Sequence, residues 1–199
     1  MEKMELYSKF ERFWHWTQAV LVILLGVTGF EIHSSFQLFG FELAVRLHSA
    51  AAWAFLILIV VAIFWLFVTG QYKNFVPTSE NMKAQINYYL SGIFKNAAHP
   101  THKTKLSKLN PLQRIVYLAL IILVFPVQLI SGFLYMYYHY PKIHLASLEY
   151  VALIHVIGAF LLVIFLIVHL YLITTGAKVW TNLWAMITGY EELETEKKK

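Results

Sequence analysis

The chain has 199 residues, of which 59% are hydrophobic and 14% are charged, and its formal net charge is +5. Soluble domains carry about 25% charged residues, so this composition excludes a globular protein that is exposed to water on all sides. The chain contains no cysteine, which excludes disulfides, iron–sulfur clusters held by thiolates, and covalent attachment of haem through a CxxCH motif.

Four segments of 18 to 28 residues contain no Asp, Glu, Lys or Arg: 13–30, 47–72, 115–141 and 150–177. A helix needs roughly 20 apolar residues to cross a bilayer, and a lone span must be helical to satisfy its backbone hydrogen bonds in lipid. The sequence therefore predicts an all-α membrane protein, a four-transmembrane-helix bundle in a single domain over 1–199. We expect the helices over about 12–33, 43–69, 111–136 and 148–175.

The longest connection, 70–110, lies between the second and third predicted helices. Within it, Pro77 and an N-cap at Thr78 or Ser79 precede apolar residues at helical spacing. These apolar residues are Met82, Ile86, Tyr89, Leu90 and Ile93. The pattern predicts a short amphipathic helix on the membrane surface, and a helix packed on a soluble partner fits it equally well. Pro126 predicts a kink in the third helix, and the tail 190–199 is expected to be solvated.

The basic residues indicate membrane topology rather than nucleic-acid binding. Fourteen of the 16 Lys and Arg residues lie in the N-terminal tail, the segment 70–114 or the C-terminal tail, whereas Arg46 and Lys142 lie in the two opposite loops. Because cytoplasmic loops collect Lys and Arg, we expect both termini and the long connection to be cytoplasmic. The chain is then a multi-pass membrane protein.

Four of the nine histidines, His15, His48, His155 and His169, lie both in an apolar segment and in a predicted helix. An ionisable residue at membrane depth indicates a functional site, although any single one could be a neutral imidazole bonded to a carbonyl of a neighbouring helix. The predicted topology places His15 and His169 near the cytoplasmic face, on different helices. It places His48 and His155 near the outer face, again on different helices.

His155 and His169 are 14 residues apart, about four helical turns and about 21 Å along the axis, so they share one face of the fourth helix. Paired imidazoles from two helices are the ligands of a bis-histidine haem, whereas zinc usually has four ligands that include Cys or acidic residues. We therefore predict two haem b groups, one held by His15 and His169 and one by His48 and His155. Arg12 and Arg46 could pair with haem propionates.

The remaining histidines carry weaker signals. His99 and His102, spaced HPTH, could ligate a metal, but no third and fourth ligands are evident. His33, His139 and His144 fall at the predicted outer boundary or in the outer loops, where we expect solvation at the interface.

The segment RFWHWTQAVLVILLGVTGF, the later RLH and the H-x13-H spacing resemble the dihaem cytochrome b subunits of nickel–iron hydrogenase, formate dehydrogenase N and thiosulfate reductase. The segments LNPLQRIVYLAL and MITGYEE are also similar to that group, and the likeness spans residues 10–192. The resemblance implies the same four haem ligands, the same pairing and a location in the bacterial inner membrane.

The resemblance also implies a role in electron transfer. An iron–sulfur subunit, joined to a catalytic subunit of the hydrogenase, formate dehydrogenase or molybdopterin sulfur-oxyanion reductase type, would exchange electrons with the outer haem. Menaquinone or ubiquinone would react near the inner haem. The quinone candidates are Trp14, Gln18, His169, Tyr171 and Thr174. The connection 70–111 is long and the outer loops are short. The alternative that the partner docks on the cytoplasmic side therefore stays open.

Two other functions fit parts of the pattern. A stand-alone quinone-linked dihaem oxidoreductase, similar to a superoxide oxidase, would need a basic funnel to attract an anion, and only Arg46 and Lys142 are available on the outer side. A haem-free transporter or assembly factor could use the histidines as a proton relay, and a colourless purified protein would favour it. The sequence does not indicate the partner's substrate, the direction of electron flow or the oligomeric state.

Overall fold

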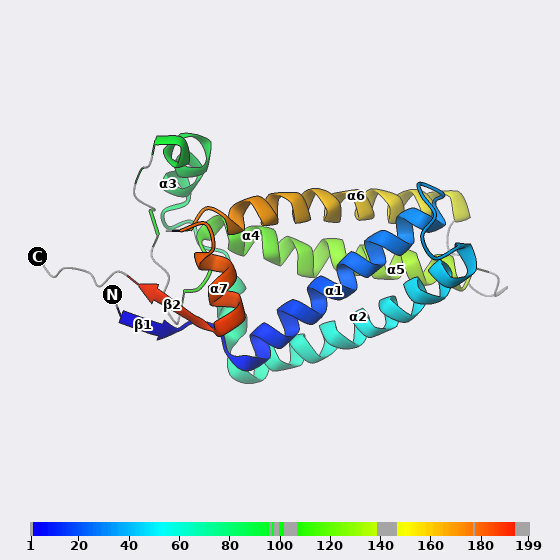
Figure 1. Ribbon diagram of the computed structural model, residues 1–199, viewed down its shortest axis with the longest axis horizontal. Helices are drawn as coiled ribbons and strands as arrows, with labels where there is room; N and C mark the ends of the chain where they lie inside the picture. The colour runs from blue at the N-terminus through cyan, green and yellow to red at the C-terminus, as the bar shows by residue number, and fades with distance from the viewer. Residues whose placement is uncertain are drawn as a thin grey trace, which may run out of the picture. The chain divides into compact units, whose positions relative to one another are not determined.

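The computed structural model describes residues 2–95, 97, 100–101, 107–138, 147–176 and 178–193. The predictions for His99, His102, His139, His144 and Lys142, and for the tail from residue 194, lie outside these residues. The helices are α1 (Lys9–Ile32), α2 (Phe41–Thr69), α3 (Met82–Asn87), α4 (Pro111–Ala119), α5 (Phe125–Met136), α6 (Leu148–Ile173) and α7 (Thr181–Thr188) (Figure 1). The strands are β1 (Glu2–Glu5) and β2 (Tyr190–Leu193).

Four helical segments in the described residues are long and apolar enough to cross a membrane: Lys9–Ile32, Phe41–Thr69, Pro111–Met136 and Leu148–Ile173. They confirm the four predicted spans. Only 6 to 28% of their most apolar windows is buried inside the protein. Most of the remaining apolar surface is therefore available to lipid, as the bilayer requires of a membrane bundle.

Local sequence fixes where two of the spans begin. The Ser8 hydroxyl accepts the Glu11 N–H, and Glu11 accepts the Ser8 N–H in return, which forms a capping box at the start of α1. Asn110 and Gln113 form the same reciprocal cap before Pro111, the first residue of α4. Proline suits this position because its missing N–H would have no helical partner there.

The irregularity expected at Pro126 takes the form of a π-helical turn. The segment Leu120–Val124 is π-helical and lies between α4 and α5. Proline cannot donate to the carbonyl four residues earlier, and its ring clashes with that carbonyl in a regular α-helix. The wider turn directly before Pro126 accommodates both effects.

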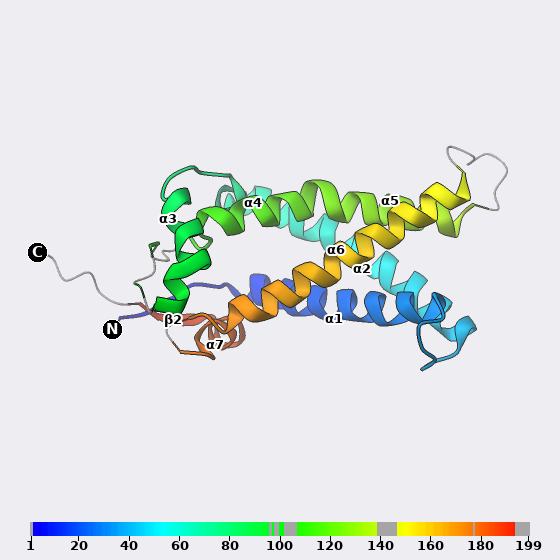
Figure 2. The same cartoon turned by 90° about the horizontal axis from the view of Figure 1, so that it is seen from above.

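The chain divides into two compact units. Unit 1 contains residues 1–12, 66–120 and 168–199, and unit 2 contains residues 13–65 and 121–167. Within unit 2, the segments of α1, α2, α5 and α6 run along one another (Figures 1 and 2). Aromatic pairs join them: Phe30 with Phe160 across α1 and α6, and Trp53 with Phe133 and Phe55 with Phe125 across α2 and α5.

A buried carboxylate holds the loop between α1 and α2 in unit 2. Glu31 is 4% exposed, and its Oε1 accepts the backbone N–H groups of Leu38, Phe39 and Gly40 at 2.7–2.8 Å. Gly40 has a φ of 84°, which favours glycine at this turn into α2. No local sequence pattern indicates this role for Glu31.

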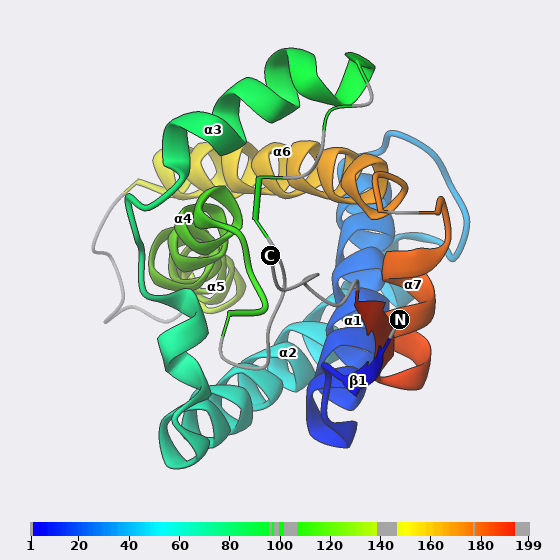
Figure 3. The same ribbon diagram turned by 90° about the vertical axis from the view of Figure 1, so that its left-hand side faces the viewer.

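In unit 1, segments from near both ends of the sequence form a two-stranded antiparallel sheet. β1 pairs with β2 over Glu2–Glu5 and Tyr190–Leu193, beside α7 (Figure 3). The Gly189 carbonyl accepts the N–H groups of Leu6 and Tyr7. Tyr190–Leu193, which fall in the tail expected to be solvated, therefore form a strand, because their backbone groups find hydrogen-bond partners in the N-terminal strand.

The connection 70–110 is tied into unit 1 by buried polar contacts. Lys108 Nζ lies 2.6 Å from Glu11 Oε1, with the two side chains 9% and 14% exposed, and the Lys108 N–H donates to Asn74 Oδ1. Lys108 also lies over the Tyr7 ring. Burial and the nearby Glu191 raise the pKa of Tyr7, which keeps its hydroxyl neutral.

The helix predicted within this connection begins later than expected. Asn81, in the left-handed region at φ 57°, precedes Met82, and neither Thr78 nor Ser79 is the N-cap. The helix α3 contains Met82–Asn87 and is followed by the π-helical segment Tyr88–Gly92. Ile86, Leu90 and Phe94 are exposed at four-residue spacing, which favours an apolar face toward lipid or a partner.

Candidate haem-binding site

His48 on α2 and His155 on α6 face each other within unit 2. Their ring centroids are 6.2 Å apart and their planes cross at 73°, and both side chains are half-buried. The structure thus brings together the two histidines that the sequence pairs near the predicted outer face. Their role as haem ligands stays a prediction. The geometry around the two rings shows whether they are suited to it.

The Thr28 hydroxyl on α1 determines which nitrogen of His48 carries hydrogen. Thr28 Oγ1 donates to the Leu24 carbonyl at 2.7 Å and lies 3.0 Å from His48 Nδ1. Because the single hydroxyl hydrogen is used on Leu24, the His48 Nδ1 must donate to Thr28. Nε2 of His48 therefore keeps its lone pair.

The Ser131 hydroxyl on α5 has the same role for His155. Ser131 Oγ donates to the Val127 carbonyl at 2.7 Å and lies 3.1 Å from His155 Nδ1, and the Gln128 carbonyl lies 3.2 Å from the same nitrogen. Both oxygens can only accept, so Nδ1 donates and Nε2 keeps its lone pair. The Gln128 amide Nε2 lies 3.3 Å from His155 Nε2.

Two glycines make room for the imidazoles. A Cβ on Gly29 would lie 3.3 Å from His48 Cε1, and a Cβ on Gly132 would lie 2.9 Å from His155 Cε1. A third glycine, Gly158, faces the buried Gln128 Oε1, which has no hydrogen-bond partner in the described part of the chain. The Gln128 side chain thus occupies the notch at Gly158 and has to rotate before His155 Nε2 can bind a metal.

These residues fit a bis-histidine haem. A metal–imidazole bond of about 2.0 Å, with the ring nitrogen about 1.1 Å from its ring centre, places the centroids of two imidazoles on opposite sides of a metal about 6.2 Å apart. The observed centroid separation is 6.2 Å. Both histidines also have the tautomer that an iron ligand needs. Haem b bound here would supply a one-electron redox centre.

The second predicted pair is divided between the two units. His15 belongs to unit 2 and His169 to unit 1, so their pairing stays a prediction. The His15 ring makes an edge contact with Trp16, at 5.2 Å between centroids.

The quinone candidates are divided in the same way. In unit 2, Trp14 Nε1 donates to Gln18 Oε1 at 2.9 Å. In unit 1, the Thr174 hydroxyl donates to the Tyr171 carbonyl, while His169 lies two residues before Tyr171 and so on a different side of α6. The quinone pocket therefore stays a prediction.

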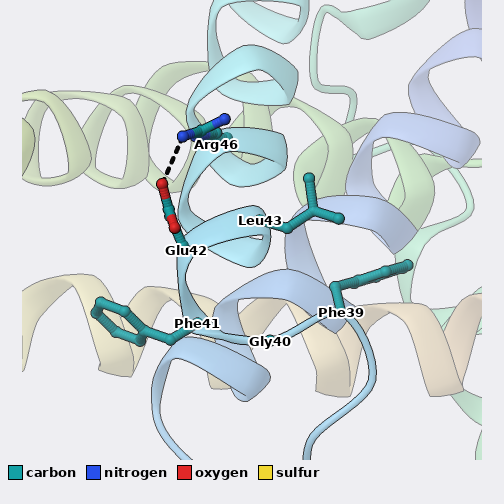
Figure 4. Close-up of a pocket in the computed structure, with 6 residues that line it drawn as sticks. All are labelled: Phe39, Gly40, Phe41, Glu42, Leu43 and Arg46. Carbon is teal, nitrogen blue, oxygen red and sulfur yellow. Dashed lines mark hydrogen bonds and ion pairs between the residues drawn. The ribbon is translucent and has the colours of Figure 1, made fainter.

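Arg46 lies in an open pocket at the start of α2, lined by Phe39, Gly40, Phe41, Glu42, Leu43 and Arg46 (Figure 4). It forms an ion pair with Glu42, and the two side chains are 72% and 80% exposed. Residues two apart on a helix do not face the same side, so Arg46 and His48 leave α2 in different directions. A contact with a propionate stays a prediction for Arg46.

Arg12 has a structural role that the sequence did not suggest. Its Nη1 donates to the Ile187 carbonyl at 2.8 Å, near the C-terminal end of α7, where a positive charge is favourable. Its buried Nε has no hydrogen-bond partner among the described residues and lies against Gly189. The propionate role of Arg12 stays a prediction.

Sequence reasoning missed Thr28, Ser131 and Gln128 as neighbours of the histidines. A signal was present, because Thr28-Gly29-Phe30 and Ser131-Gly132-Phe133 have the same order of hydroxyl, glycine and phenylalanine on the first and third spans. The likeness between the two spans is limited to these short triplets.

The chain is similar to known membrane cytochromes over most of its length. The prokaryotic cytochrome b561 family matches residues 6–189. The protein named "Putative cytochrome YdhU" of Escherichia coli (strain K12) is 32% identical over 201 residues, which cover 95% of this chain and 75% of that protein. The resemblance to cytochrome b membrane subunits is confirmed. The chain belongs to the prokaryotic cytochrome b561 family and is a b-type, electron-transferring cytochrome that crosses the bacterial inner membrane four times.

Proposed function

We propose that the chain is a dihaem membrane subunit that passes electrons between a peripheral iron–sulfur subunit, joined to a catalytic subunit, and the quinone pool. His48 and His155 would hold one haem b, and His15 and His169 the second. Menaquinone or ubiquinone would react near the His15 end. The catalytic partner would be of the hydrogenase, formate dehydrogenase or molybdopterin sulfur-oxyanion reductase type.

The observation that carries the proposal is the opposed pair His48 and His155. Their separation suits one metal between them, and the hydroxyls of Thr28 and Ser131 leave both Nε2 atoms able to ligate. His155 and His169 lie on the same helix, α6, and their spacing of about four turns is about 21 Å along its axis. Two redox centres at that separation support electron transfer across the membrane.

A basic funnel for an anionic substrate finds little support among the described residues on the predicted outer side. Arg46 is already paired with Glu42. This observation favours a subunit that exchanges electrons with a protein partner over a stand-alone oxidase that attracts an anion.

Haem stoichiometry and reduction by quinol test the proposal. The protein purified in mild detergent should contain two haem b per chain, and a soluble quinol analogue should reduce them. The variant His169→Ala should keep the outer haem and lose the inner one, and the quinol should then no longer reduce the protein. One haem per chain, or full haem reduction by dithionite but none by the quinol, would contradict the proposal.

A further inference from the structure

We propose that Thr28 and Ser131 are matched positioning residues that lower the redox potential of the haem held by His48 and His155. The inference rests on the proposed haem ligation by these two histidines. It assigns to the two hydroxyls a role in tuning the metal through the ligand nitrogen rather than in binding it.

The two hydroxyls have the same surroundings on α1 and α5. Each donates to the carbonyl four residues earlier, Leu24 for Thr28 and Val127 for Ser131, in both cases at 2.7 Å. Each then accepts from a histidine Nδ1, at 3.0 Å for His48 and 3.1 Å for His155.

The carbonyl three residues before each hydroxyl completes the match. The Leu25 backbone carbonyl hydrogen-bonds His48, and the Gln128 backbone carbonyl hydrogen-bonds His155 Nδ1. The residue after each hydroxyl-bearing residue is a glycine, Gly29 or Gly132. A Cβ at either position would press against the same imidazole. The same four-part arrangement therefore occurs once for each histidine.

Thr28 and Ser131 are 0% and 5% exposed, so water does not replace these contacts. A back-bond from Ser or Thr to the carbonyl four residues earlier is common in membrane helices and needs no function. Here, however, both back-bonded hydroxyls direct their remaining acceptor capacity at a histidine on another helix. Packing alone does not require that coincidence on two separate helices.

An acceptor at Nδ1–H makes the imidazole a stronger donor through Nε2, which favours the oxidised metal and lowers its potential. Removing one hydroxyl leaves the backbone carbonyl as the second acceptor, so the tautomer and the bound haem are retained. The expected effect is therefore a shift in potential without loss of haem.

The test is an anaerobic redox titration of the purified protein, with the two haems resolved by their optical and electron paramagnetic resonance signals. Thr28→Val and Ser131→Ala should each raise the reduced-to-oxidised ratio of the outer haem at fixed potential about threefold, or about 28 mV at 59 mV per tenfold. Thr28→Ser and Ser131→Thr keep the hydroxyl and should titrate as the wild type.

Thr188→Val is the matched control, because Thr188 makes the same back-bond, to the Trp184 carbonyl, on α7 outside the spans. It should leave the outer potential unchanged. Haem-replete Thr28→Val and Ser131→Ala proteins with the wild-type potential would overturn the inference and leave haem ligation intact. A His48→Ala protein that kept both haems would instead overturn the ligation itself.

Discussion

Gly132 is the tightest point around His155, since a Cβ there would lie 2.9 Å from the imidazole Cε1. We predict that Gly132→Ala displaces the ring, at an overpacking cost of about 1–3 kcal/mol, and lowers the content of the outer haem. The measurement is the haem-to-protein ratio after purification. Gly26→Ala is the matched control, because a Cβ at Gly26 meets nothing within 4 Å. Equal haem content in the two variants would show that the contact is unimportant.

Arg46 and Glu42 offer a paired test of charge at the start of α2. Arg46→Gln leaves Glu42 unbalanced and should lower the potential of the outer haem, whereas Glu42→Gln leaves Arg46 unbalanced and should raise it. Because both side chains are well exposed, screening should limit each shift to roughly 10–40 mV. A redox titration measures both variants, and shifts of the same sign would remove the pair from the site.

At the scale of single residues, the sequence pointed to the histidines as site candidates but not to their hydroxyl partners. An ionisable residue in an apolar segment is conspicuous because it is costly there. Serine and threonine are ordinary residues in membrane helices, since they can satisfy their hydroxyls on their own backbone. The relation of Thr28 to His48 appears only when α1 and α2 are placed side by side.

The start of α1 depends on Glu11, which belongs both to the capping box and to the buried ion pair with Lys108. Glu11→Gln keeps the cap, since Gln also suits that position, but leaves Lys108 without its counter-charge. We predict a loss of about 3–5 kcal/mol in the free energy of unfolding, as for other broken buried pairs. Ser8→Ala, which removes the cap and keeps the pair, should cost about 1 kcal/mol.

Thermal unfolding in detergent, followed by circular dichroism, ranks these variants. The double variant Glu11→Gln/Lys108→Met removes both charges and should recover most of the lost stability. A Glu11→Gln protein as stable as Ser8→Ala would show that the ion pair contributes little.

At the scale of elements, the helices that follow from composition were predictable from the sequence. The elements that depend on tertiary contacts were not. The four spans follow from length and apolarity alone. The sheet of β1 and β2 joins residues from the two ends of the chain, which no local pattern reveals. Lys108 was counted as a cytoplasmic loop charge, yet its side chain is buried against Glu11, because a distant residue supplies the counter-charge.

The topology of the whole molecule can be measured because the chain contains no cysteine. Ser35, in the loop before α2, and Ser79, in the connection before α3, are both exposed. We predict that Ser35→Cys reacts with a membrane-impermeant maleimide in intact cells and that Ser79→Cys reacts only after permeabilisation. The reverse pattern would mean that both termini lie outside.

The distribution of charge predicts this orientation, but the sequence alone does not place His15 relative to His169. Their pairing depends on the arrangement of α1 and α6 at the opposite end of the spans. The structure brings the rings of His48 and His155 together, because both residues lie in one compact unit with Thr28 and Ser131.

The most direct test of the account is the haem content of His48→Ala, His155→Ala and the variant that carries both changes. If the two histidines bind a single iron from opposite sides, each of the three proteins should retain one haem per chain, the inner one. The retained haem should have the same spectrum and potential in all three. Loss of different haems in the two single variants, or of both haems in the double variant, would contradict the account.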